Sequence, residues 1–177
     1  ASLPPGPILI VGAGTGNDVS AALRSTDRQV DAVEIDPSIL GIGERLHFER
    51  PYQNPRARRV VADARSHFQR TDRRYALVVF GFLDSHTLLS SFSSLRLDNF
   101  VYTLESLRSV RELLLPGGEV YLTFASDREW IHRRIVRLLD ETFDAKTRVT
   151  VPGSFAYGIA YRNQRAAGPP ATRVADP

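Results

Sequence analysis

Three glycines at every second position, Gly12, Gly14 and Gly16, are the residues best suited to let a ligand approach the backbone. They follow four apolar residues without alternation, 8–11, as in a strand buried on both faces of a parallel sheet. Apolar residues at helical spacing come next. Glycine adopts positive φ readily, and the first N–H groups of the helix face whatever polar group lies there. The order strand, turn, helix therefore predicts a binding turn, with a purely structural turn as the alternative.

A carboxylate in the second predicted strand, 30–37, complements this turn. Glu34 lies 34 − 12 = 22 positions beyond Gly12, close to the ~20-residue separation at which an acidic residue meets the ribose hydroxyls of a nucleoside. A carboxylate accepts hydrogen bonds from both hydroxyls at once. Asp36 and Pro37 instead favour a helix start, with Asp36 as the N-cap. We therefore expect Glu34 to bind the ligand and Asp36 to cap the helix.

Asp63 ends a third predicted strand, 58–63, and has two possible roles. In doubly wound folds ligands bind at the carboxyl ends of the strands, where Asp63 could accept from an adenine amino group. It could equally be the N-cap of the short predicted helix 64–70. A fourth buried strand, 75–80, leads into residues 84–86, Asp-Ser-His. The arginines beside the third strand are expected to form a solvated strand entrance rather than a basic patch.

Composition limits the class of protein. The 177 residues suit one domain, and the net charge of +3 with scattered arginines predicts no nucleic-acid partner. The absence of cysteine excludes disulfides, thiolate catalysis and cysteine-based zinc sites. No apolar run approaches the ~20 residues of a membrane span, and the histidines share no metal-ligand spacing. We expect a cytoplasmic protein without metal. Because the chain starts at Ala1 without any methionine, we also expect a domain of a longer protein, which could itself carry a membrane segment.

The second half of the sequence predicts a helix up to Leu114, a fifth strand over 119–125, and a helix with Trp130 near its start. Two close strands follow over 146–151 and 154–161, which reads as a hairpin with one antiparallel strand. The polar tail from Arg162 is predicted to be disordered. The expected architecture is α/β, a Rossmann-like doubly wound sheet of about seven strands, mostly parallel with one antiparallel strand near the C-terminus. The expected division is a domain over 1–163 and a tail or linker over 164–177.

The G-x-G-x-G turn with Glu34 and Asp63 resembles the class I S-adenosylmethionine (AdoMet)-dependent methyltransferases. Asn17 stands where a dinucleotide fingerprint G-x-G-x-x-G would have its last glycine, and no second nucleotide-binding half follows, which disfavours an NAD-dependent oxidoreductase. Within the superfamily the sequence is similar to the spermidine synthase-like branch over about residues 7–161. Three segments carry that similarity: 9–14 (LIVGAG), 33–36 (VEID), and 101–108 (VYTLESLR) before 115–118 (LPGG).

Departures from the aminopropyltransferases of that branch bear on the reaction. Those enzymes have an aspartate that holds the propylamine end of decarboxylated AdoMet, and Thr15 stands at that position here. Their base, which deprotonates the attacking amine, corresponds to Gly81, and only the later Asp84 of that motif is retained. A tyrosine of the amine pocket is expected where this chain has Leu107. Because general-base help is worth ~10²–10⁴ in rate, the resemblance implies another transfer, and methyl transfer is favoured.

The resulting interpretation is an AdoMet-dependent transferase, a methyltransferase with an unidentified small-molecule acceptor. Methyl transfer depends largely on in-line positioning and needs few catalytic groups. The alternatives are an aminopropyltransferase that uses decarboxylated AdoMet and a non-catalytic nucleoside-binding domain of a larger protein; a homodimer is left open. Asp84 is the predicted catalytic residue, and Ser85, His86 and Tyr102 are predicted to bind substrate. AdoMet, or S-adenosylhomocysteine as product, is predicted to be bound by Gly12, Ala13, Gly14, Thr15, Gly16, Asn17, Asp18, Glu34, Ile35, Asp63 and Ala64.

Overall fold

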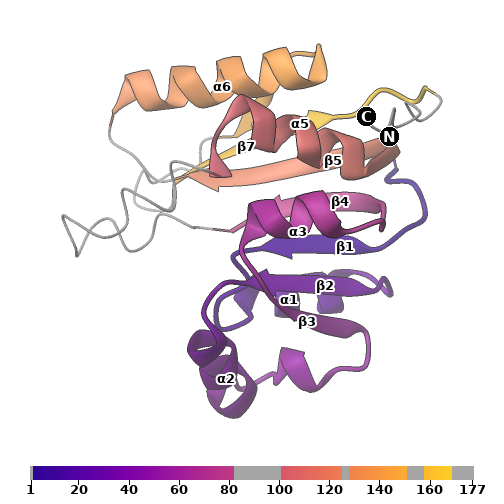
Figure 1. Ribbon diagram of the computed structural model, residues 1–177, viewed down its shortest axis with the longest axis vertical. Coiled ribbons are helices and arrows are strands. Elements are labelled where there is room, and N and C mark those ends of the chain that lie inside the picture. The colour runs from indigo at the N-terminus through magenta and orange to yellow at the C-terminus, as the bar shows by residue number, and fades with distance from the viewer. Residues whose placement is uncertain (1, 82–100, 125–127, 151–157, 169–177) are drawn as a thin grey trace.

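The strands of the chain form one mixed sheet, seen in a computed structural model that describes residues 2–81, 101–124, 128–150 and 158–168. Within these residues the sheet has seven strands in the order β3-β2-β1-β4-β5-β7-β6 (Figure 1). The strands are β1 (Ile8–Val11), β2 (Val30–Glu34), β3 (Ala57–Val61), β4 (Tyr75–Phe80), β5 (Leu114–Phe124), β6 (Arg148–Thr150) and β7 (Ile159–Gln164). The helices are α1 (Asn17–Ser25), α2 (Pro37–Leu46), the 3₁₀ turn η1 (Pro51–Gln53), α3 (Ala64–Arg70), α5 (Leu104–Leu113) and α6 (Glu129–Phe143).

Strands β1 to β5 pair in parallel, and β7 pairs antiparallel with both β5 and β6. The strand order reverses at β1, which lies between β2 and β4. This arrangement confirms the predicted Rossmann-like sheet with one antiparallel strand near the C-terminus. It also brings the ends of β2, β1 and β4 together at one edge of the sheet, which is where ligands bind in doubly wound folds.

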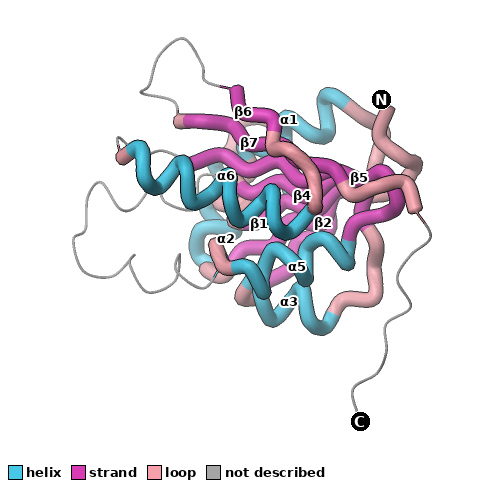
Figure 2. Tube along the Cα trace, turned by 90° about the horizontal axis from the view of Figure 1, so that it is seen from above, coloured by secondary structure: helices cyan, strands magenta, loops and turns pink. Residues whose placement is uncertain are grey.

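Two hydrophobic cores lie on the two faces of the sheet. Ile8 and Ile10 of β1 pack with Val19 of α1 and Leu40 of α2 in one core. The alternate residue Leu9 belongs to the other core, which includes side chains of α3, α5 and α6. Figure 2 shows α3, α5 and α6 on one side of the sheet and α1 on the other. Alternate residues of β1 point to opposite faces, so its uninterrupted apolar run supplies both cores.

The second half departs from the predicted boundaries. Leu114, expected at the end of a helix, instead begins β5, because α5 ends at Leu113 and the chain pairs with Tyr75 of β4 at once. The register shifts between Tyr75 and Leu77, where Pro116, Gly117 and Gly118 pass through β5. A proline and two glycines indicate a turn in sequence, whereas the sheet accommodates them at this irregularity.

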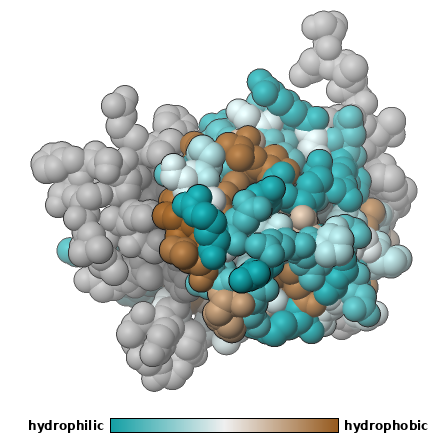
Figure 3. Space-filling view, turned by 90° about the horizontal axis from the view of Figure 1, so that it is seen from below, coloured by the Kyte–Doolittle hydropathy of each residue, from teal (hydrophilic) through white to brown (hydrophobic). Residues whose placement is uncertain are grey.

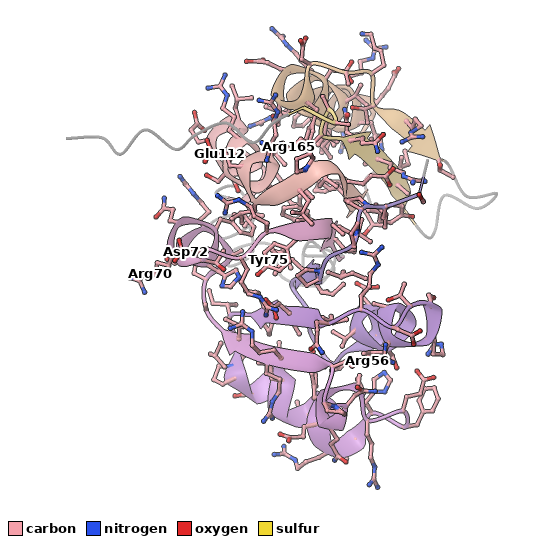
Figure 4. The ribbon with its side chains drawn as sticks, turned by 90° about the vertical axis from the view of Figure 1, so that its right-hand side faces the viewer. Arg56, Arg70, Asp72, Tyr75, Glu112 and Arg165 are labelled. Carbon is pink, nitrogen blue, oxygen red and sulfur yellow. The ribbon has the colours of Figure 1, made fainter. Side chains whose placement is uncertain are left out.

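The last strand runs further than predicted. β7 continues to Gln164, so Arg162 is not part of a disordered tail. Beyond the strand, the Arg165 guanidinium donates to the carbonyl oxygens of Arg111, Glu112 and Leu114 at 3.2, 3.2 and 2.6 Å, at the end of α5. Figure 4 shows Arg165 beside Glu112 on this side of the molecule. These bonds satisfy carbonyl groups that a helix end leaves without helical partners. The division into a domain and a tail stays a prediction, because residues 169–177 lie outside the described part.

The arginines before and within β3 have partners, and Arg58 and Arg59 are exposed, in agreement with the expected solvated strand entrance rather than a basic patch. Arg56 donates to the carbonyl oxygens of Leu23 and Thr26 at the end of α1, far from Arg165 in Figure 4. Arg58 forms a two-point pair with the buried Asp31, and Arg59 pairs with Glu44 of α2. Among the described residues, no helix is both long enough and apolar enough to cross a membrane.

Candidate functional site

The glycine turn between β1 and α1 has the positive φ angles that the sequence predicts. Gly12, Gly14 and Gly16 have φ values of 68°, 55° and 105°, in the left-handed region that side chains rarely adopt. The Gly12 and Ala13 N–H groups both donate to the Val33 carbonyl oxygen, at 2.9 and 3.0 Å, and so fix the turn on β2. Gly16 is the N-cap of α1 and offers no side-chain cap. The start of α1 therefore faces the carboxyl edge of the sheet without a capping side chain.

Close packing beneath the turn also requires glycine. A Cβ on Gly16 would lie 2.6 Å from Pro51 Cγ, and a Cβ on Gly43 of α2 would lie 2.3 Å from the Thr15 carbonyl oxygen. Both distances are far below van der Waals contact. Gly16 therefore serves the packing of η1 against the turn, and Gly43 lets α2 approach it. Gly43 was not predicted as part of the site, although a glycine inside a helical pattern does indicate close backbone approach.

Tyr52 of η1 supports the turn from below and was missed by the sequence interpretation. Its hydroxyl donates to the carbonyl oxygens of Ala13 and Gly14, at 3.1 and 2.7 Å. Its burial, and then the nearby negative charges of Glu34 and Asp18, raise its pKa. The phenol therefore stays protonated and remains a donor. No local motif marks this residue, because its role depends on a contact 38 positions away in the sequence.

Replacing Tyr52 by phenylalanine should lower the free energy of unfolding by about 1 kcal/mol, the usual contribution of a buried hydroxyl hydrogen bond. Urea denaturation followed by circular dichroism measures this difference. Tyr121→Phe, at a partly exposed tyrosine of β5, is the matched control and should leave the stability within about 0.5 kcal/mol of wild type. Equal stability of Y52F and wild type would show that the hydroxyl does not hold the turn.

Glu34 joins the end of β2 to the glycine turn. The side chain is only 8% exposed. Its Oε2 accepts from the Gly14 N–H at 2.9 Å, and its Oε1 accepts from the N–H groups of Ile35 and Asp36 at 2.8 and 3.1 Å. Three backbone N–H donors therefore fix the Glu34 carboxylate beside the turn. This is the carboxylate that the sequence predicts to bind the ribose hydroxyls. Asp36 accepts from the Ser38 N–H at 2.7 Å, which confirms its predicted role as the N-cap of α2.

Apolar side chains are exposed beside the Glu34 carboxylate. Ile35 is 48% exposed, and Val61, the register partner of Glu34 on β3, is 58% exposed. Figure 3, a view of the molecule from below, shows apolar side chains set among hydrophilic ones on the face drawn there. Asp63, just beyond β3, accepts from the Ser66 N–H at 2.9 Å as the N-cap of α3, which starts at Ala64. An exposed apolar surface next to a fixed carboxylate suits the flat base of a nucleoside. Ile35 was predicted to bind the cofactor, whereas Val61 was not.

The remaining predicted residues of the first crossover differ in their surroundings. Thr15 is exposed at the tip of the turn. The side-chain oxygen of Asn17 lies 3.1 Å from His47 Nε2, so Asn17 is directed toward the end of α2. Asp18, in the first turn of α1, has its Oδ2 close to Gly81 at the end of β4. Of these three side chains, Asp18 is the one placed between β1 and β4.

Aromatic side chains gather where β4 and β5 end. The Tyr102 ring lies between Phe80 of β4 and Phe124 of β5, with ring centroids 6.3 and 5.3 Å apart. The Thr123 hydroxyl donates to the Phe80 carbonyl oxygen at 3.0 Å and ties the two strands together. Tyr102 therefore borders the same sheet edge as the glycine turn. The predicted catalytic residue Asp84 and the neighbouring Ser85 and His86 lie outside the described residues.

A separate hollow of about 650 Å³ lies between α6 and the strands β6 and β7. Its lining includes Glu129, His132, Val149 and Tyr161, and none of the predicted site residues. Within the described part of the chain, no three His, Asp or Glu side chains are grouped as metal ligands. The candidate site is therefore the edge formed by the glycine turn, Glu34 and the end of β4, not this hollow.

Comparison with solved structures supports the fold assignment. The chain superposes on spermidine synthase from Thermotoga maritima with a TM-score of 0.72 and 16% identity, covering 93% of this chain and 55% of that one. A spermidine synthase in complex with the transition-state analogue AdoDATO gives a TM-score of 0.70 with the same identity and coverage. Human methyltransferase-like protein 13 in complex with SAH gives 0.71 at 19% identity, covering 96% of this chain and 76% of that one.

These similarities define the class of fold. The chain has the class I AdoMet-dependent methyltransferase fold in its spermidine synthase-like form, as the sequence predicted. It spans about half the length of the spermidine synthases that it matches. No family model matches the sequence.

Proposed function

We propose that this protein is an AdoMet-dependent transferase and that it transfers a methyl group to a small-molecule or protein acceptor. The observation that carries the proposal is the Glu34 carboxylate, buried and held 2.9 Å from the Gly14 N–H of the glycine turn. A nucleoside with its ribose hydroxyls on this carboxylate would place its base over Ile35 and Val61. The fold shared with proteins solved with SAH and with AdoDATO supports the same ligand class.

The residues present fit such a ligand. Backbone N–H groups occupy three of the roughly four lone-pair positions of the Glu34 carboxylate, so Oε2, which has a single backbone donor, keeps an acceptor position for a ribose hydroxyl. The backbone of Gly12 to Gly16 leaves room because it carries only the side chains of Ala13 and Thr15. Asp63 and Ala64 border the base end at the start of α3, and Asp18 borders the other end at β4. AdoMet supplies an activated methyl group on a sulfonium. The protein then has to align that carbon with the acceptor and exclude water, which demands few catalytic groups. Asp84 is the proposed group that orients or deprotonates the acceptor.

Aminopropyl transfer is the second candidate, because two of the structural neighbours are spermidine synthases. Against it stands Gly81, which has no side chain to act as the base that these enzymes carry at the matching position. Methyl transfer needs no such base when the acceptor is already neutral. A non-catalytic nucleoside-binding domain is the third candidate, and it shares the same ligand site.

Isothermal titration with S-adenosylhomocysteine, AdoMet and NAD tests the ligand class. We expect micromolar binding of both adenosyl amino acids and none of NAD, because the site offers a ribose-binding carboxylate but no second nucleotide-binding half. If neither S-adenosylhomocysteine nor AdoMet bound, the proposed function would be overturned. Incubation with decarboxylated AdoMet and putrescine separates the two transfers, since spermidine formation would establish aminopropyl transfer instead.

A further inference from the structure

Helix α2 carries apolar side chains on a face that the core does not use. Its buried side chain Leu40 belongs to the core. Ile39, Ile42 and Leu46 recur at intervals of three and four residues, which places them together on one face of the helix. Exposure rises along this face, from the partly buried Ile39 to 42% at Ile42, 75% at Leu46 and 86% at Phe48 just beyond the helix. We call Ile42, Leu46 and Phe48 the α2 tip.

The turn after α2 holds Phe48 in its exposed position. The His47 N–H donates to the Gly43 carbonyl oxygen at 3.1 Å, and the Arg50 N–H donates to the His47 carbonyl oxygen at 2.9 Å. The rings of His47 and Phe48 stack with their centroids 5.2 Å apart, and His47 Nδ1 accepts from the Glu49 N–H at 3.2 Å. Arg50 has a left-handed φ of 47°, which costs free energy for a residue with a side chain. The exposure of Phe48 is therefore a defined feature of this turn.

The charged side chains around the α2 tip leave an excess of positive charge. Glu44 and Glu49 each form an ion pair with an arginine of another segment. Arg45 and Arg50 bracket the tip in the sequence and are exposed. Neither of these two arginines forms an ion pair within the part of the chain that the structure describes. An apolar tip flanked by two uncompensated guanidinium groups complements a surface that is apolar inside and anionic outside.

A lipid surface fits this combination better than a second copy of the chain. Peripheral membrane binding combines apolar side chains at the acyl boundary with basic side chains at anionic headgroups. The tip has only three apolar side chains at the end of a helix of ten residues, far from the ~800 Å² that each partner of a stable protein interface typically buries. Two copies that met at this surface would also bring their arginines together. Figure 1 shows α2 at the lower end of the molecule.

We propose that the α2 tip docks the protein reversibly on an anionic lipid surface. Leu46 and Phe48 insert at the acyl boundary, and Arg45 and Arg50 contact the headgroups. The inference does not depend on the proposed transfer activity. Helix α2 begins three residues after Glu34, and ten helical residues span about 15 Å. A docked protein therefore holds the candidate site near the lipid surface.

Flotation with lipid vesicles tests the proposal on the whole chain. Vesicles of phosphatidylcholine with about 30 mol% phosphatidylserine carry the negative surface charge of an anionic leaflet, and vesicles of phosphatidylcholine alone are the neutral comparison. We expect the protein to float with the anionic vesicles and to bind the neutral ones at least tenfold more weakly. Raising the salt concentration should weaken binding to the anionic vesicles, because salt screens exposed charges.

The double variant Leu46→Ser/Phe48→Ser removes the apolar anchors and should bind anionic vesicles at least tenfold more weakly than wild type. Trp130→Ser is the matched control, because Trp130 is a 62% exposed aromatic residue of α6, at the opposite end of the molecule from α2 in Figure 1. Its binding should stay within about twofold of wild type.

The charge variant is Arg45→Gln/Arg50→Asn, in which asparagine is chosen because it tolerates positive φ. Each arginine near an anionic surface is expected to strengthen binding about fivefold, so both changes together should have a clear effect. Arg134→Gln/Arg137→Gln removes two exposed arginines of α6 and should leave binding unchanged. Circular dichroism shows whether each variant is folded.

Three results would overturn the proposal: no binding of wild type to anionic vesicles, equal binding to both kinds of vesicle, or unchanged binding of Leu46→Ser/Phe48→Ser. A wild-type dimer in sedimentation velocity that this variant dissociates, without vesicle binding, would assign the α2 tip to a second copy instead. Titration of the same variants with AdoMet keeps the two proposals separate. Their affinity for AdoMet should equal that of wild type, whatever the vesicles show.

Discussion

Replacing Glu34 by alanine should lower the affinity for S-adenosylhomocysteine by about 100-fold. The loss is large because the carboxylate is charged and buried, and each hydrogen bond to a charged group contributes about 1.5–3 kcal/mol to binding. The same change leaves the N–H groups of Gly14, Ile35 and Asp36 without their acceptor, so the turn loses its anchor as well. Glu34→Gln keeps the length of the side chain but offers one acceptor atom instead of two. We expect it to lose about tenfold, and isothermal titration measures both variants.

Asp36→Ser is the control for this result. It removes a negative charge two residues from Glu34 and keeps a good N-cap for α2, because serine caps helices about as well as aspartate. Its affinity for S-adenosylhomocysteine should stay within about twofold of wild type. Thermal unfolding of each variant shows that the folded state persists at the titration temperature. If the folded Glu34→Ala protein bound as tightly as wild type, the carboxylate would only brace the turn.

Replacing Asp31 by asparagine should destabilise the protein by about 3 kcal/mol at pH 7, the lower end of the cost of breaking a buried ion pair. Asp31 of β2 is fully buried. It accepts from Arg58 at 2.9 and 2.7 Å, from Arg73 at 2.7 and 3.0 Å, and from the Tyr75 hydroxyl at 2.8 Å. The two arginines are 52% and 41% exposed, so they remain partly hydrated when the carboxylate is lost. Urea denaturation at pH 7 gives the difference in the free energy of unfolding.

The destabilisation should depend on pH in a defined direction. Burial alone would raise the pKa of Asp31, but the hydrogen bonds from Arg58 and Tyr75 and the charges of both arginines lower it overall. A folded-state pKa below the unfolded value of about 3.9 means that the unfolded chain takes up the proton first. The stability from Asp31 is therefore fully present above about pH 4 and is lost as pH falls through the folded-state pKa. The gap between wild type and Asp31→Asn should shrink below about pH 4.

An exposed pair in the same half of the sheet serves as the control. Glu44→Gln removes the partner of Arg59, and these side chains are 38% and 44% exposed. Solvent-exposed pairs contribute about 0–1 kcal/mol, so this variant should lose less than about 1 kcal/mol at pH 7. Equal losses for Glu44→Gln and Asp31→Asn would contradict the central role of the buried carboxylate.

Local sequence features were sufficient to predict the first half of the sheet. The apolar run 8–11, the spaced glycines and the Asp36-Pro37 helix start each specify a local conformation, and the structure shows all of them. Such signals fail in the second half. Leu114 continues a helical apolar period, yet pairing with Tyr75 draws it into β5. Arg162 looks like a polar tail, yet β7 pairs with β5 up to Gln164.

At the candidate site, the amino-acid sequence by itself determined the strand-turn-helix order, because that order depends on residues close together in the chain. It also determined the position of Glu34, because one strand–helix–strand unit sets the number of residues between the turn and the end of the next strand. Only the tertiary structure decided that Tyr52 and Gly43 support the turn and that Val61 lies beside Glu34. It also decided that Asp18 lies over Gly81, 63 residues further along. These contacts join segments that no local period relates, since parallel strands become neighbours only when the crossovers between them have folded. Their chemistry therefore depends on the strand order of the sheet rather than on any motif.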